Sequence, residues 1–199
     1  MRWFVVIVVV LAWSTGDARA DDSRYHYGVG FGPASLTGDL ADHFSSDGQV
    51  SGRIYAGRRV GDWAVDAVFF GTDLALTGRP GEGTHSTLGL GVDVRRFVEL
   101  FPHLEAYVRG GVDYTWLVRC HSDAPPAGYS GSGYHYGAGL EVSWRWRLPR
   151  RSGKPRMDLG LQLFADAGRQ RTRLAKSGQK TLAGQIDQLT FGFGFSFAH

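Results

Sequence analysis

The chain has 199 residues, a length sufficient for one domain with a sizeable core. Aromatic side chains make up 13% of the residues and charged side chains 21%, so the composition supplies apolar surface to bury and excludes a disordered chain. The net charge is only +3, without the clustered basic face that a nucleic-acid-binding protein needs, so we expect no nucleic-acid partner.

The N-terminal segment has the pattern of a secretory signal peptide. Arg2 supplies a positive charge, residues 4–13 form an apolar stretch, and residues 18–20 form a small-residue cleavage site. The apolar stretch has about 10 residues and is too short to cross a bilayer as a helix, which takes about 20. We therefore predict a signal peptide over 1–20 and a mature domain over 21–199.

From residue 25 onward, apolar residues alternate with small or polar residues at a period of two, which is typical of β-strands. The stretch 190–199 is a clear example, because four phenylalanines alternate there with Thr, Gly, Gly and Ser. The pattern predicts eight strands, over residues 25–36, 50–60, 63–73, 85–98, 104–118, 133–148, 157–170 and 184–197.

The links between these strands alternate between short and long. Short turns are predicted at 61–62, around Pro102 and over 149–156. An even number of strands joined in this way is the plan of an outer-membrane barrel, whose sheet must close because lipid cannot satisfy an open edge. We therefore predict an all-β fold, a closed antiparallel eight-stranded transmembrane up-and-down barrel, with long loops over 37–49, 74–84, 119–132 and 171–183.

The two faces of the predicted strands differ in composition. One face combines glycines with charges of both signs, which suits the narrow interior of an eight-stranded barrel, where buried charges must pair. The predicted charge cluster of this lumen consists of Arg53, Asp66, Asp93, Arg95, Glu105, Arg109, Asp113, Glu141, Arg145 and Asp166, and Arg59, Asp158 and Asp187 are assigned to the same face.

The other face is apolar, and its aromatic residues collect near the strand ends. Two aromatic girdles flanking an aliphatic band fit the two interfaces of a bilayer. A half-buried sheet of a soluble protein also alternates, so a soluble lipocalin-like binding barrel remains an alternative. The predicted girdles are Tyr25, Trp63, Trp144, Trp146, Phe195 and Phe197 on the short-turn side, and Phe69, Tyr114, Trp116, Tyr134 and Tyr136 on the loop side.

The last predicted strand carries Thr190-x-Gly192-x-x-Phe195-x-Phe197, which resembles a C-terminal assembly signal of outer-membrane barrels. With the strand count and the alternating links, the chain resembles the small eight-stranded outer-membrane barrels of the OmpA transmembrane domain and OmpX kind. The resemblance implies insertion by the outer-membrane assembly machinery, and we expect a monomer with both termini in the periplasm. The chain departs from the pattern at its end, where Ala198 and His199 follow the last phenylalanine.

The sequence offers little support for catalysis or for metal binding. The pairs His85-Ser86 and His121-Ser122 lie near long loops, but adjacent residues of a strand point to opposite faces and seldom form a nucleophile–base pair. We expect no catalytic residue, although a lipid-modifying outer-membrane enzyme remains an alternative. His26 and His135 share the lumen face without a carboxylate at a set spacing, so we expect neither metal nor cofactor.

Basic residues gather around the last long loop, namely Arg169, Arg171, Arg173, Lys176 and Lys180. They either contact phosphates of lipopolysaccharide, which suit the guanidinium fork, or line a solvated loop. An eight-stranded barrel has an interior that side chains fill, so we expect no wide pore. The expected function is structural or interactive: membrane integrity, adhesion or ligand contact through four extracellular loops, in contact with outer-membrane lipid and lipopolysaccharide.

Overall fold

The computed structural model of the protein describes residues 23–44, 49–74, 85–119, 128–147 and 158–198. The predicted signal peptide and the His121-Ser122 pair lie outside these residues, as does Cys120.

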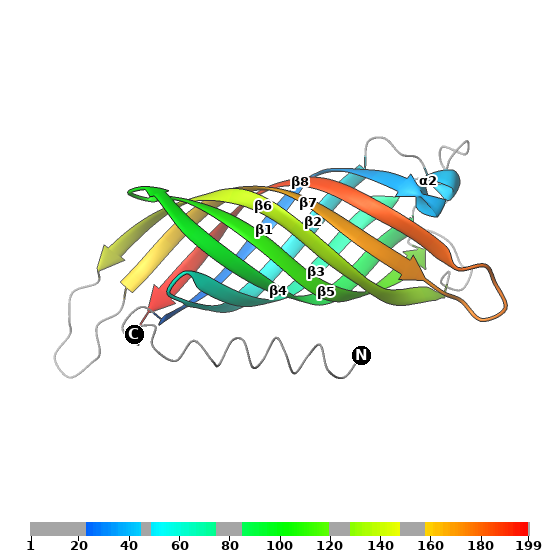
Figure 1. The fold of residues 1–199 in the computed structure, drawn as a ribbon, viewed down its shortest axis with the longest axis horizontal. Helices are drawn as coiled ribbons and strands as arrows, with labels where there is room; N and C mark the ends of the chain where they lie inside the picture. The colour runs from blue at the N-terminus through cyan, green and yellow to red at the C-terminus, as the bar shows by residue number, and fades with distance from the viewer. Residues whose placement is uncertain (1–22, 45–48, 75–84, 120–127, 148–157, 199) are drawn as a thin grey trace.

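The described residues form a closed β-barrel in which each strand pairs antiparallel with the next and the last strand pairs with the first (Figure 1). The closing pair aligns Tyr25 with Phe197 and Phe31 with Phe191. The predicted fold class is thereby confirmed. The strands are β1 (Ser23–Gly38), β2 (Gln49–Val60), β3 (Trp63–Leu74), β4 (His85–Phe101), β5 (Leu104–Arg119), β6 (Tyr129–Arg147), β7 (Asp158–Leu174) and β8 (Leu182–Ala198).

The strands extend further toward the long loops than the sequence pattern predicts. β6 begins at Tyr129 rather than at 133, and β7 ends at Leu174 rather than at 170. The reason is that alternation continues: Thr172 and Leu174 are buried, and Leu174 pairs with Leu182 on β8. The predicted bounds of the loop, 171–183, are therefore too wide, because 171–174 belong to β7 and 182–183 belong to β8.

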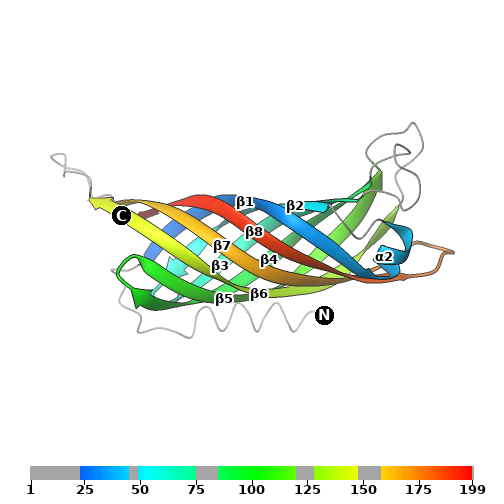
Figure 2. The same cartoon turned by 90° about the horizontal axis from the view of Figure 1, so that it is seen from above.

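A short helix, α2 (Asp39–His43), lies within the predicted loop 37–49. Gly38, which precedes it, has a φ of 74°, a left-handed conformation that glycine adopts without steric cost. Leu40 of this helix is completely buried, and α2 lies at the loop end of the barrel against β1 and β8 (Figure 2). No helix in the described part of the chain is long and apolar enough to cross a membrane.

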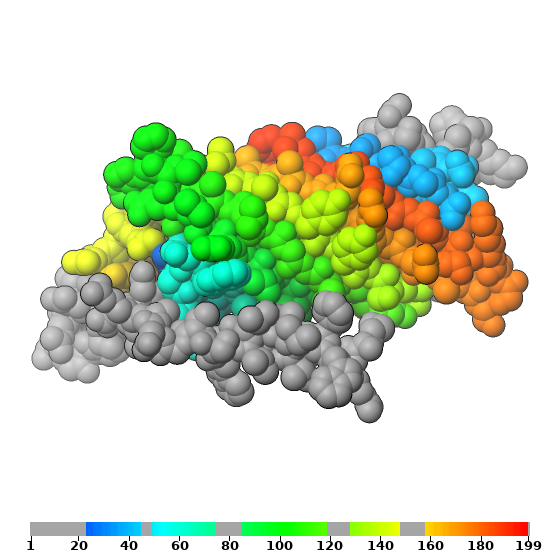
Figure 3. Space-filling model, viewed as in Figure 1, coloured from blue at the N-terminus to red at the C-terminus, as the bar shows by residue number. Residues whose placement is uncertain are grey.

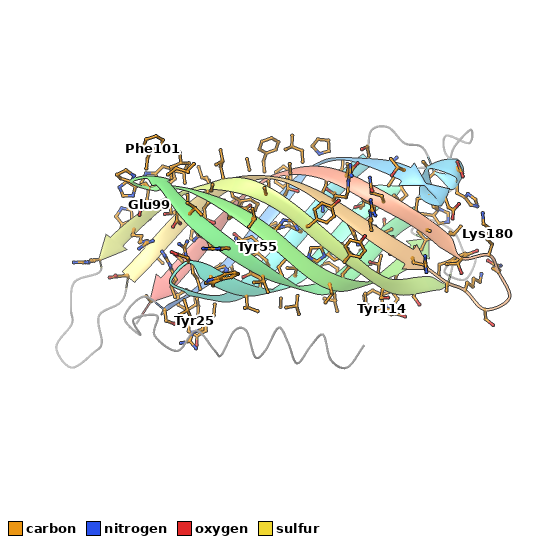
Figure 4. All side chains as sticks on the ribbon, viewed as in Figure 1. Tyr25, Tyr55, Glu99, Phe101, Tyr114 and Lys180 are labelled. Carbon is orange, nitrogen blue, oxygen red and sulfur yellow. The ribbon has the colours of Figure 1, made fainter. Side chains whose placement is uncertain are left out.

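The outer surface of the barrel carries the apolar face of the strands. Figure 3 shows the strands packed into a continuous wall on the face in view, and Figure 4 shows Tyr25 and Tyr114 outside the barrel near opposite ends, with Tyr55 inside. Large apolar side chains stay exposed on this wall, more than the isolated patches that a soluble protein shows. Among them are Phe31, Ile54, Leu90, Val108, Val112, Leu140, Leu163, Phe191 and Phe193, with aromatic residues toward both ends.

Candidate functional site

The interior of the barrel holds a nearly balanced set of buried charges, which every described strand except β8 helps to provide. An arginine is almost never fully buried without a partner, so these charges are expected to form ion pairs with one another. The buried lumen charges comprise five arginines and six carboxylates: Arg24, Arg53, Arg59, Arg95, Arg109, Asp66, Asp93, Glu105, Asp113, Glu141 and Asp166.

Near the short turns, Arg59 and Glu105 form a two-pronged ion pair. The Arg59 Nη1 and Nη2 atoms donate to the two carboxylate oxygens of Glu105 at 2.7 and 2.5 Å. The Arg59 guanidinium also lies 3.9 Å from the centre of the Phe97 ring, a cation–π contact. This fork geometry fixes both side chains and closes this end of the lumen with charge-assisted hydrogen bonds.

The next layer joins β1, β3, β4 and β6 through a second charge cluster. Arg95 Nε donates to Asp66 Oδ2 at 2.6 Å, and His26 Nε2 lies 2.5 Å from the other Asp66 oxygen. Arg95 Nη1 is 3.8 Å from Glu141 Oε2, so one arginine links two carboxylates. The Arg95 guanidinium further packs 4.6 Å from the centre of the Tyr55 ring.

A third cluster lies above this layer, toward the long loops. Arg109 donates from Nε and Nη2 to the two oxygens of Asp166, both at 2.7 Å, and its Nη1 atom is 3.7 Å from Asp93. His135 contacts Asp93 through Nε2 and lies 3.0 Å from Asp113 through Nδ1. Removing any one member would leave a buried charge without its partner.

Arg53 lies between the second and third clusters and is held mainly by rings. Its guanidinium carbon is 5.3 Å from the centre of the Tyr55 ring and 5.6 Å from that of Phe164, and Nη1 lies 3.7 Å from Asp166. None of its three nitrogen atoms makes a hydrogen bond to another described residue. The contacts are therefore electrostatic and cation–π in character.

Aromatic side chains also lie on the lumen face, as a group that the sequence analysis did not identify. They separate the charge layers and fill the space beside the glycines, since a Cβ at Gly139 would lie 2.7 Å from the Tyr107 ring. The sequence does carry a signal for them: each of these aromatic residues is an even number of positions from the polar residues of its strand and therefore points to the same face as they do. These residues are Tyr55, Phe70, Phe97, Tyr107 and Phe164.

The loop end of the lumen is filled by an apolar plug that the sequence reasoning also missed. Leu40 of α2 lies in this plug, together with inward-facing side chains from five strands. Its members, which we call the mouth cluster, are Ala34, Leu36, Leu40, Phe44, Leu74, Leu117, Leu174, Leu182 and Ile186. Charged groups thus fill the part of the barrel nearer the short turns, and a dry core closes the other end.

Two predicted lumen residues lie elsewhere. Arg145 has the inward parity, but its side chain is exposed because β6 continues to Arg147, beyond the charge layers. The prediction for Asp187 is wrong: it pairs across the ladder with Arg169 on the outer wall, and its carboxylate accepts from Arg169 Nε at 2.6 Å. The inward positions of β8 are instead Ile186, Gln188 and Thr190, one residue out of step with Asp187.

The five basic residues near the last hairpin divide into two groups. Arg169, Arg171 and Arg173 lie on β7 and alternate with inward-facing residues, so they point outward. Lys176 and Lys180 lie in the turn that follows, and Lys180 Nζ is 3.5 Å from Asp39 of α2 (Figure 4).

The residues with catalytic or ligating potential have other partners. Ser86 donates to Asp73 at 2.7 Å, whereas the ring of His85 contacts Phe44 on the opposite face of β4. Among the described residues no group of three His, Cys, Asp or Glu side chains is placed to hold a metal ion. His26 and His135 are instead bonded to aspartates within the lumen.

The C-terminal strand places the four residues of the sequence signal on both faces. Thr190 and Gly192 face the lumen, and Gly192 has Phe164 so close that a side chain would not fit. Phe195 and Phe197 face outward; Phe197 stacks on Tyr25 of β1 with ring centres 5.8 Å apart, and the Phe195 ring lies tilted against Tyr27 at 5.7 Å. The last strand therefore seals the barrel through both its small and its aromatic residues.

Comparison with known proteins finds relatives in structure alone. No family model and no curated protein matches the sequence. Neisserial surface protein A (NspA) is similar with a TM-score of 0.57 at 13% identity, over 85% of this chain and 95% of that chain. Ail, the attachment invasion locus protein of Yersinia pestis in complex with the heparin analogue sucrose octasulfate, gives 0.49 at 12% identity, over 87% and 98%. The outer membrane protein OprG from Pseudomonas aeruginosa gives 0.40 at 13% identity, over 90% and 97%.

At these identities the likeness to NspA is a likeness of fold. The closed eight-stranded barrel, with its apolar wall, is the fold of the small outer-membrane barrels, as the resemblance in the sequence implies.

Proposed function

We propose that the protein is a structural and interaction barrel of the bacterial outer membrane, which acts through its outer surface and its loops rather than as a conduit. The observation that carries this proposal is the filled interior. Ion-paired arginines occupy the lumen, and the mouth cluster closes it with apolar side chains that water does not wet readily.

The proposal includes a secretory signal at 1–20, a mature domain over 21–199, and both termini on the periplasmic side. In support, β1 begins and β8 ends at the same end of the barrel, where Tyr25 pairs with Phe197 (Figure 1). Two hairpins in the described residues at that end are also short, since Gly61 and Asp62 alone connect β2 to β3, and Pro102 and His103 alone connect β4 to β5. Short periplasmic turns and longer external loops are the usual arrangement of such barrels.

The proposed partners are outer-membrane lipid, lipopolysaccharide and the assembly machinery that inserts barrels. The last strand, with Thr190, Gly192, Phe195 and Phe197, would be the segment that the machinery reads. Arg169, Arg171 and Arg173 support lipopolysaccharide contact because they project outward from one strand near its loop end, with Lys176 and Lys180 in the turn beyond. A single barrel without open edges needs no second copy, so we propose a monomer.

Conductance across a planar bilayer tests the closed interior. We expect the refolded protein to insert without the stepwise ion currents of a porin, because the charge layers and the mouth cluster leave no open path. The matched control is an open porin reconstituted in the same lipid. Regular large-conductance steps from the wild-type protein would contradict the proposal and would assign the barrel to a transport function.

A further inference from the structure

A groove of about 610 Å³ runs across the outer wall of the barrel, over β1, β8, β7 and β6. These strands lie side by side on one face of the molecule (Figure 2). The groove lies outside the lumen and is separate from the charge layers. Its outward-facing lining residues are Pro33, Ser35, Tyr136, Ala167, Arg169, Asp187 and Leu189.

The groove is concave because its floor carries little side-chain volume. Gly137 pairs with Gly168 across β6 and β7, and Ala138 pairs with Ala167 in the next row. Gly137 and Gly168 face the lumen, where a Cβ on Gly168 would meet Arg109, so the residues that keep the outer floor low are Ala138 and Ala167, whose side chains are single methyl groups. Pro33, Leu189 and Tyr136 stand around this floor. The hollow is thus built into the wall by residue size.

Two polar rows cross the wall at and above the groove. In the first row, Ser35 pairs with Asp187, Asp187 with Arg169, and Arg169 with Tyr136. The Arg169 guanidinium is already neutralised, because it donates to both Asp187 oxygens at 2.6 and 3.1 Å. This row is polar but carries no net charge.

The second row, one step toward the loops, does carry a net positive charge. It aligns Thr37, Gln185, Arg171 and Tyr134 across the same four strands. Arg171 donates to Gln185 Oε1 and to the Tyr134 hydroxyl, both at 3.3 Å. Within the described residues its hydrogen bonds reach only neutral groups, so its charge is available to an anion. Arg173 is exposed on the same face one step further out.

From the lower edge of the groove toward the short turns, the wall is apolar. Leu189, Ala167 and Ala138 form one row across β8, β7 and β6. The next row contains Phe191, Ala165 and Leu140, which face outward into the apolar band. The surface therefore changes from apolar to neutral polar to cationic over three successive rows. That order matches an amphiphile with its chain toward the bilayer centre and an anionic head at the surface.

We infer that the groove binds a phosphorylated glycolipid of the outer leaflet, of the lipid A class. One acyl chain would lie over Ala167 and Leu189, and a phosphate would lie against Arg171 and the Tyr134 hydroxyl. Guanidinium and hydroxyl donors suit phosphate oxygens, and burying a chain in the hollow removes apolar surface from the interface. This inference rests on the proposed function for the orientation of the barrel, and it names the site of the lipopolysaccharide contact.

The test is binding of purified lipid A to the detergent-refolded protein, followed by native mass spectrometry. Ala167→Trp fills the hollow, and Arg171→Gln removes the free charge. The matched controls are Ala67→Trp, on the outer face of β3, and Arg58→Gln, on β2 at the short-turn end. We expect each groove variant to weaken lipid A binding at least tenfold, and each control to bind like the wild type. A heat-shifted band on a gel shows that each variant is folded.

Two ligand arms identify the bound chemistry. We expect inorganic phosphate at millimolar concentration not to displace lipid A from the protein. We expect phosphatidylethanolamine to bind at least tenfold more weakly than lipid A. Wild-type affinity in both Arg171→Gln and Ala167→Trp would overturn the inference, as would equal binding of phosphatidylethanolamine. If Ala167→Trp fails to fold, the comparison of Arg171→Gln with Arg58→Gln decides. Loss of the groove site leaves the outer-membrane proposal standing, whereas a protein absent from the outer membrane removes both.

Discussion

At the scale of single residues, the lumen is organised around arginines that each serve more than one partner. Arg95 contacts Asp66 and lies near Glu141, and Arg109 contacts Asp166 and lies near Asp93. Buried ion pairs do not by themselves guarantee stability, because desolvation offsets most of the attraction. Their loss is costly all the same, since a single substitution strands a charge inside the barrel. Each of these arginines therefore requires its carboxylate partners, and each of those carboxylates requires its arginine.

Arg109→Ala is the substitution that should show this most clearly. It removes both hydrogen bonds to Asp166 and the nearby charge that Asp93 faces, so we expect the free energy of unfolding to fall by about 3–5 kcal/mol. Urea unfolding of the refolded protein in detergent, followed by tryptophan fluorescence, measures the change.

The control for this experiment is Arg145→Ala. Arg145 is also an arginine with inward parity, but its side chain is exposed beyond the charge layers. We expect this variant to unfold within about 0.5 kcal/mol of the wild type, as exposed substitutions usually do. Equal unfolding midpoints for the two variants would mean that the charge layers do not hold the barrel together.

The sequence predicts the residues of the lumen better than their pairing. Alternation alone assigns Asp66 and Arg95 to the inner face, because successive side chains of a strand point to opposite sides. It does not reveal that Arg95 bonds to Asp66, which depends on strand register and on a side chain long enough to cross the lumen. The wrong lumen assignment of Asp187 departs from this alternation, because Asp187 lies three residues from inward-facing Thr190 and so belongs to the outer wall.

At the scale of elements, the strands outgrow the bilayer on the loop side. β1 has 16 residues, and β7 and β8 have 17 each, whereas about 9–11 suffice to span the hydrocarbon. The additional length carries the mouth cluster and supports α2. The sequence did not predict this arrangement, because α2 has only 5 residues and a helix so short leaves no periodic pattern. Its position depends on tertiary packing of Leu40 and on the contacts of Asp39.

Asp39 couples α2 to β8 in a way that depends on pH. Its Oδ2 atom accepts a hydrogen bond from the Ala183 amide at 3.0 Å. This hydrogen bond, together with Lys180, lowers the pKa of Asp39 below its ordinary value of 3.8. A lowered pKa means that the carboxylate stabilises docking at pH values above the ordinary pKa. That contribution is lost as the pH falls through the lowered one.

Hydrogen exchange of the Ala183 amide should report this coupling. At pH 7 we expect the amide to exchange several-fold more slowly in the wild type than in Asp39→Ala, and at pH 3 we expect the difference to shrink toward none. Comparing the two proteins at each pH cancels the intrinsic rate of exchange. The Gly192 ladder amide serves as the internal control and should be equally protected in both. A difference at Ala183 that persists undiminished at pH 3 would contradict a role for the Asp39 charge.

At the scale of the whole molecule, the barrel carries its buried charges inside and a band of large apolar side chains outside, the inverse of a soluble protein. This inversion was readable from the sequence, because a strand such as 184–197 carries four phenylalanines on one face and little volume on the other. The number of strands followed from the period-two pattern, and closure followed from the requirement that no sheet edge stays open in lipid. The groove over β6, β7, β8 and β1 was not readable, because it arises where small residues of several strands align, and only the register brings them together.

The central claim is that lipid covers the apolar wall, and cell fractionation followed by gel electrophoresis with and without boiling tests it most directly. We expect the protein in the outer-membrane fraction, released only by detergent, with an unboiled band that migrates apart from the boiled one because the closed barrel resists the detergent of the gel. Recovery as a detergent-free periplasmic protein with a single band would contradict the account, because Phe191, Phe193 and the rest of the exposed wall would then have to be covered by protein.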